Sequence, residues 1–121
     1  MSKRILVVED QEDNRRIVRD LLTSVGYEIV EAVTGEDGVR MAETHVPDLI
    51  LMDIQLPGID GYEATRRIKA HAALQQIPVI AVTSYALSGD DVKAFEAGCN
   101  AYVSKPFSPR ALLAKIREFV P

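Results

Sequence analysis

The sequence predicts an α/β fold in which helices cover both faces of a doubly wound, parallel, five-stranded sheet. Short apolar runs alternate with amphipathic helical patterns five times along the chain. Three of the runs are continuous and rich in β-branched residues, which is typical of strands buried on both faces. Every connection between runs is too long for a hairpin, so the strands are expected to be parallel. The runs lie at 5–8, 28–32, 49–52, 78–82 and 101–103.

The first two runs and the pattern between them illustrate both kinds of element. The second run alternates with glutamates, which favours a strand at the edge of the sheet. Between the two runs, apolar residues recur every four positions and end before a glycine, as in an amphipathic helix with a glycine at its C-terminus. These helical residues are Ile17, Leu21 and Val25, with Val18 and Leu22 beside them and Gly26 as the stop.

Capping residues mark the other helices. Thr34 begins a pattern that resembles a capping box, with Asp37 in place of the usual Glu or Gln, ahead of Val39 and Ala42. Ser108 followed by Pro109 is an N-cap with proline at the first helical position, before Leu112 and Ile116. The remaining helical patterns cover 62–70, with Ala64 and Ile68, and the segment from Ser88 through Val92 and Phe95 to Gly98.

Composition sets the class of protein. With 121 residues, 47% of them apolar and 26% charged, the chain is expected to form a single domain over 1–121. No apolar stretch approaches the roughly 18 residues of a membrane span, and the N-terminus does not resemble a signal peptide. The single cysteine, Cys99, fits a reducing cytoplasm, and a net charge of −4 argues against nucleic-acid binding driven by bulk charge. We therefore expect a cytoplasmic domain with no effector domain, whose output is protein–protein contact.

Polar side chains follow four of the five predicted strands, at the point where each strand ends. In open α/β sheets, ligands bind at the carboxyl ends of the strands. Three carboxylates, hydroxyl groups and one ammonium group should therefore converge on one edge of the sheet. The residues concerned are Glu9 and Asp10, then Asp53, then Thr83 and Ser84, and finally Ser104 and Lys105.

The chemistry of this set favours magnesium and phosphoryl transfer. Three neighbouring carboxylates repel one another unless a cation joins them, and Lys105 offsets only one of their charges. Mg²⁺ is commonly held by one or two carboxylates together with water and a phosphate oxygen. Zinc is disfavoured because Cys99, His45 and His71 show no ligand spacing. An Asp beside Mg²⁺, a Lys and a Thr hydroxyl group is what a carboxylate acceptor of a phosphoryl group requires.

Several of these residues together resemble the motifs of a known protein family. Glu9-Asp10, the segment 51–58 (Leu-Met-Asp-Ile-Gln-Leu-Pro-Gly), Thr83 and Lys105-Pro106 look like the signature of a two-component response-regulator receiver domain, the CheY-like family. The sequence is similar to those of stand-alone cell-cycle regulators of the DivK type and of receivers attached to hybrid kinases. The resemblance covers the whole chain and implies a flavodoxin-like sheet with strand order 2-1-3-4-5.

The resemblance also implies roles for single residues. Asp53 would accept the phosphoryl group from a phosphohistidine of a histidine kinase or histidine phosphotransfer protein. Mg²⁺ would be held by Asp53, by Asp10 directly, by Glu9 through water and by the backbone carbonyl of Gln55. Lys105 and Thr83 would contact the phosphoryl group, and Tyr102 would act as an aromatic switch coupled to Thr83. Gln55 and Tyr85 would control dephosphorylation. The Lys105-Pro106 peptide bond would be cis.

Two departures from the family pattern are mild. Glu9 stands where Asp is commoner, and Ser84 stands where a small alanine usually follows the threonine. Ser84 could affect how tightly the phosphoryl pocket is gated. The downstream target is expected on the face formed by the fourth helix, the fifth strand and the fifth helix.

Other interpretations compete with this one. Taken alone, Glu9-Asp10 could cap the first helix, Asp53 could begin a turn, Thr83 could be a turn or cap hydroxyl and Lys105 could be an exposed lysine. The alternative function is a Mg²⁺-dependent phosphatase or phosphotransferase that works through aspartyl-phosphate. Such enzymes generally need a second acid two residues after the nucleophile, where this chain has Gln55. Nucleotide or flavin binding is disfavoured because no glycine-rich loop follows the first strand. The expected protein is thus a switch that catalyses only its own phosphotransfer and autodephosphorylation.

Overall fold

The computed structural model describes residues 2–83, 90–105 and 108–121. Its sheet has five strands within these residues, all parallel and in the order β2-β1-β3-β4-β5. The predicted fold class and strand order are therefore confirmed. The strands are β1 (Arg4–Val8), β2 (Glu28–Ala32), β3 (Leu49–Asp53), β4 (Val79–Thr83) and β5 (Ala101–Ser104).

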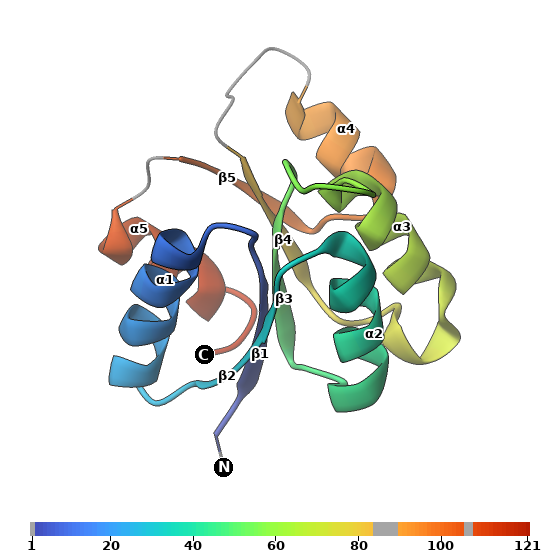
Figure 1. The fold of residues 1–121 in the computed structure, drawn as a ribbon. Helices are drawn as coiled ribbons and strands as arrows, with labels where there is room; N and C mark the ends of the chain where they lie inside the picture. Colours follow the sequence, from blue (N-terminus) through green and yellow to red (C-terminus); the bar gives the residue numbers. More distant parts are fainter. Residues whose placement is uncertain (1, 84–89, 106–107) are drawn as a thin grey trace.

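Helices cover both faces of the sheet, as expected for parallel strands joined by crossovers. In Figure 1, α1 and α5 lie on one side of the sheet and α2, α3 and α4 lie on the other. A short 3₁₀ helix, Ala72–Leu74, leads toward β4. The α-helices are α1 (Glu12–Ser24), α2 (Gly35–His45), α3 (Gly61–Ala70), α4 (Asp90–Ala97) and α5 (Pro109–Arg117).

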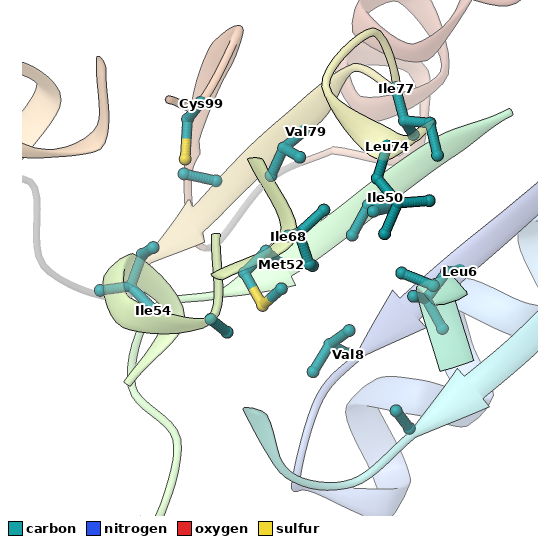
Figure 2. Packing of buried hydrophobic residues seen from close by; sticks show 14 of the residues in the cluster. Leu6, Val8, Ile50, Met52, Ile54, Ile68, Leu74, Ile77, Val79 and Cys99 are labelled. Carbon is teal, nitrogen blue, oxygen red and sulfur yellow. The ribbon is translucent and has the colours of Figure 1, made fainter. Parts of the chain in front are cut away.

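Two hydrophobic clusters, one on each face, make up the core. Alternation along β3 sends Ile50 and Met52 into the cluster with α2, α3 and α4, while Leu49 and Leu51 join the cluster with α1 and α5. Figure 2 shows the first of these clusters. Every residue of β3 and β4 is buried, whereas Glu28 of β2 is exposed and its next three residues are only partly buried. The glutamate alternation in β2 thus correctly predicted an edge strand.

The predicted caps at α2 and α5 are confirmed. The Thr34 hydroxyl accepts the backbone N–H of Asp37, and the Ser108 hydroxyl accepts the N–H of Ala111. At α1, the residue in the capping position is Gln11, whose side chain makes no capping bond. The interpretation of Glu9-Asp10 as a helix cap is therefore wrong, and both acids are available to the edge of the sheet.

The predicted apolar stripe of α1 differs from the side chains that the helix buries. The buried residues of this helix are Val18 and Leu22, while Ile17 is 58% exposed and Val25, just beyond the helix, is 40% exposed. Adjacent positions differ by about 100° around a helix axis, so Ile17 lies off the face that Val18 and Leu22 turn to the sheet, while Leu21 is partly buried against the same cluster. Likewise, the Val92 and Phe95 side chains of α4 are exposed. No helix in the described part of the chain has the length and apolarity that crossing a membrane requires.

Candidate functional site

Three acidic side chains meet at the carboxyl edge of the sheet. Glu9 and Asp10 directly follow β1, and Asp53 is the last residue of the neighbouring strand β3. One carboxylate oxygen from each lies within 4.8 Å of the other two. Glu9 and Asp53 are only 5% and 4% exposed, and Asp10 is half-buried. The convergence predicted from the strand ends is therefore present.

Lys105 reaches this acidic cluster from the end of β5. Its Nζ lies 2.7 Å from Glu9 Oε1 and 3.3 Å from Asp53 Oδ2. Its backbone N–H donates to the carbonyl of Thr83 at 2.6 Å, which anchors the segment beside β4. Burial by itself lowers the pKa of Lys105, but the hydrogen bond to Glu9 and the charge of Asp53 outweigh it, so that the pKa is raised. Lys105 is therefore a charged member of the site and not a surface lysine.

Backbone N–H groups hold the other oxygens of the two buried carboxylates. Asp53 Oδ1 accepts the N–H of Gln55 at 3.0 Å, and Glu9 Oε2 accepts the N–H of Gln11 at 3.1 Å. These bonds fix the carboxylates without changing their charge, so three acids and one lysine leave a formal excess of two negative charges. Clustered hard oxygen donors with such an excess fit a hard divalent cation such as Mg²⁺.

The site depends on a close approach of α3 to the end of β3, which involves a residue that the sequence analysis missed. Gly61, the first residue of α3, donates its N–H to the carbonyl of Ile54 at 2.9 Å. A Cβ at this position would overlap the carbonyl oxygen of Asp53 and lie 2.7 Å from the Ile54 Cα. Gly61 thus lets the helix pack directly on the Asp53 backbone. The signal in the sequence was a glycine after Asp60, which caps α3 through the N–H of Glu63.

The remaining predicted residues are distributed around this edge. Thr83, the last residue of β4, is 2% exposed and lies on the strand next to that of Asp53. Tyr102 is partly buried on β5 and packs against the hydrophobic cluster beneath α2, α3 and α4. Gln55 is exposed. Ser84, Tyr85 and Pro106 lie outside the described residues, as does the predicted cis peptide bond.

A cavity of about 480 Å³ extends from the acidic cluster into the layer beneath α1 and α5. Glu9, Asp53 and Lys105 line its polar end. Its apolar lining includes Val18 of α1 and Leu112 of α5. The site is therefore an open edge whose charged groups border a largely apolar cavity.

The family model for the response regulator receiver domain matches residues 5–117. The chain belongs to this family. The match includes both acids after β1, Asp53, Thr83 and Lys105, so that the whole edge described above falls within it. This receiver domain is a response regulator of the two-component type. An aspartyl-phosphate phosphatase is not favoured.

Relatives of this receiver domain extend over its whole length. The polar-differentiation response regulator DivK of Brucella ovis is 42% identical over 120 residues, which span 99% of this chain and 98% of that protein. The receiver domain of a Pseudomonas aeruginosa sensor histidine kinase, solved with a magnesium ion in its active-site cleft, is 38% identical with a TM-score of 0.92, covering 99% and 98% of the two chains. The Vibrio cholerae chemotaxis protein CheY4, at 23% identity and a TM-score of 0.93 over 98% and 99% of the two chains, shares the fold.

Proposed function

We propose that Asp53 accepts a phosphoryl group from a phosphohistidine of a histidine kinase or phosphotransfer protein, in a Mg²⁺-dependent reaction that switches protein–protein contacts. The observation that carries this proposal is the environment of the Asp53 carboxylate. One oxygen is held by Lys105 and the other by the N–H of Gln55, beside two further acids. Such a carboxylate is fixed in orientation and lies next to a site for a cation, as phosphoryl transfer requires.

Asp10, Asp53, Glu9 through water and the carbonyl of Gln55 would hold the magnesium ion. When bound, Mg²⁺ neutralises negative charge that builds up on the phosphoryl oxygens. The receiver from Pseudomonas aeruginosa, which coordinates magnesium in its cleft, supports this assignment by analogy. In this chain the support comes from the three carboxylate oxygens grouped within 4.8 Å.

The transfer itself is a substitution at phosphorus. A carboxylate oxygen of Asp53 attacks the phosphorus atom and forms a P–O bond, while the P–N bond to the donor imidazole breaks and its electron pair goes to the ring nitrogen. Lys105, already hydrogen-bonded to Asp53 and Glu9, moves its contact to a phosphoryl oxygen. Thr83, at the end of the next strand, donates a hydrogen bond from its hydroxyl group to another of these oxygens.

The output follows from the displacement of Thr83. A phosphoryl group adds about −1.5 to −2 charge and three acceptor oxygens. As Thr83 moves toward it, Tyr102 on the adjacent strand β5 can enter the space released, which changes the surface formed by α4, β5 and α5. We assign that surface to the downstream partner. We also assign control of the phosphoryl lifetime to Gln55 and Tyr85, which follow Asp53 and Thr83 by two residues in the sequence.

The test is labelling with acetyl phosphate in the presence of Mg²⁺. We expect the intact mass to rise by one phosphoryl group in the wild type and in Asp13→Asn, whose side chain is 87% exposed on the first turn of α1. Asp53→Asn should remain unlabelled under the same conditions. Equal labelling of Asp53→Asn and the wild type would place the acceptor elsewhere and refute the assignment.

A further inference from the structure

The side chain of Arg15 lies behind the two acids that follow β1. It extends from the second turn of α1 and is only 16% exposed, whereas its neighbour Arg16 is 59% exposed. The Arg15 Nη1 lies 3.0 Å from the carbonyl oxygen of Glu9 and 3.4 Å from that of Asp10. One guanidinium group thus contacts the backbone of both acids without neutralising either carboxylate.

Arg15 is itself held by an acid on the edge strand. Its Nε lies 3.3 Å from Oε1 of Glu31 on β2. Glu31 is fixed from the other side by Arg19, one turn further along α1, whose Nη1 lies 3.2 Å and 3.1 Å from its two oxygens. The Glu9 N–H in turn donates to the carbonyl of Ala32 on the same strand at 3.0 Å. The backbone of Glu9 is therefore held to β2 directly through its N–H and indirectly through its carbonyl.

We propose that Arg15 is a positioning residue for the metal site: it orients Glu9 and Asp10 toward Asp53, and Glu31 orients Arg15. This inference rests on the proposed Mg²⁺ site. The planar guanidinium group suits the role because it presents several N–H donors in a fixed arrangement, while the lysine ammonium is a single point of charge on a flexible stem. Residues that orient metal ligands in this way typically change metal affinity 10- to 100-fold when they are replaced.

Charge and position predict opposite results for Arg15. If the residue acted only through its positive charge, removing it would relieve repulsion of Mg²⁺ and tighten binding. If it acts by holding the two carbonyls, removing it loosens the acids and weakens binding. The sign of the change in Mg²⁺ affinity therefore separates the two roles.

The experiment is calorimetric titration of the full chain with Mg²⁺ alone, comparing Arg15→Gln and Arg15→Lys with the wild type. Arg16→Gln is the matched control, because it removes the same charge from the adjacent, exposed position. We expect Arg15→Gln to bind Mg²⁺ about 10-fold more weakly and Arg15→Lys to fall between it and the wild type. Arg16→Gln should bind as the wild type does, and Glu31→Gln should weaken binding less than Arg15→Gln.

A second measurement does not need the metal. The N–H of Gln11 donates to the Glu9 carboxylate, so its hydrogen exchange in EDTA reports whether that carboxylate is in place. We expect faster exchange at Gln11 in Arg15→Gln than in Arg16→Gln. Mg²⁺ affinity in Arg15→Gln equal to or tighter than in Arg16→Gln overturns the inference, as does unchanged exchange. Failure of the metal site itself is recognised separately, since wild-type Mg²⁺ binding would then be absent or insensitive to Asp10→Asn.

Discussion

Two partly buried lysines at opposite edges of the sheet have different partners. At the amino edge, Lys69 Nζ donates to the backbone carbonyls of Ile77 at 2.6 Å and Gln75 at 3.1 Å, and to Asn100 Oδ1 at 3.3 Å. At the carboxyl edge, Lys105 donates to the carboxylates of Glu9 and Asp53. Lys69 thus binds neutral acceptors in the segments that lead into β4 and β5. Lys105 instead binds two carboxylates, whose combined negative charge exceeds its own positive charge.

The pKa shifts of the two lysines go in opposite directions for this reason. Burial lowers the pKa of Lys69, whose acceptors carry no full charge. Burial also opposes the charged form of Lys105, but the hydrogen bond to Glu9 and the charge of Asp53 raise the pKa of its ammonium group. Lys69 therefore stabilises the loops at the amino edge through neutral acceptors, whereas Lys105 leaves an excess of negative charge at the carboxyl edge that a cation can neutralise.

The largest effect is expected for Lys105→Met, which removes the ammonium group that pairs with two buried carboxylates. In EDTA at pH 7 we expect a loss of about 3 kcal/mol in the free energy of unfolding, the lower end of the range for breaking a buried ion pair. Saturating Mg²⁺ should recover part of this loss, because a cation at the acidic cluster takes over the neutralisation. Urea unfolding in EDTA and in Mg²⁺ measures both values.

The pH dependence of the same variant is an internal control. Because the folded-state pKa of Lys105 is raised above its ordinary value of 10.5, its contribution is fully present below that pH and is lost as pH rises through the folded pKa. The wild type should therefore keep its advantage over Lys105→Met from pH 7 to about 10 and lose it in more alkaline solution. An advantage that disappears already near pH 8 would contradict the pairing.

A smaller effect is expected at the opposite edge for Lys69→Met. Two backbone carbonyls lose their donor, while Asn100 Oδ1 keeps the N–H of Val79 at 3.0 Å. We expect a loss of about 2 kcal/mol in the free energy of unfolding, the cost of leaving partly buried acceptors unpaired. The loss should be the same in EDTA and in Mg²⁺. If Mg²⁺ restored as much of the free energy of unfolding in Lys69→Met as in Lys105→Met, the two edges would not differ in their need for a cation.

The smallest effect is expected for Asp53→Asn, and it is stabilising. Two unit charges about 5 Å apart repel by roughly 3 kcal/mol at an effective dielectric of about 20, and water at the open edge lowers this further. Losing the bond to Lys105 offsets part of the gain, so we expect about 1 kcal/mol and a melting temperature a few degrees higher in EDTA. Mg²⁺ should stabilise the variant less than the wild type. A lower melting temperature in EDTA would mean that the carboxylates do not repel one another across a shared site.

Much of the fold was predictable because it depends on local patterns. The β-branched runs identified the central strands. The glutamates of β2 identified it as the outermost strand, since a residue on an outermost strand can reach water. Thr34 and Ser108 cap the helices that they were expected to cap. The convergence of Glu9, Asp10, Asp53 and Lys105 also followed from the sequence, because parallel strands place all their carboxyl ends on one edge.

Only the tertiary structure decided which of two adjacent apolar stripes on α1 faces the sheet, because Ile17 and Val18 are equally apolar and the packing of the helix selects between them. It also decided the contacts that hold the site. That Gly61 packs on the Asp53 backbone, and that Arg15 spans from Glu31 to the carbonyls of Glu9 and Asp10, depends on the relative placement of helices and strands. Backbone carbonyls belong to every residue, so no sequence pattern indicates which of them a given arginine will bind.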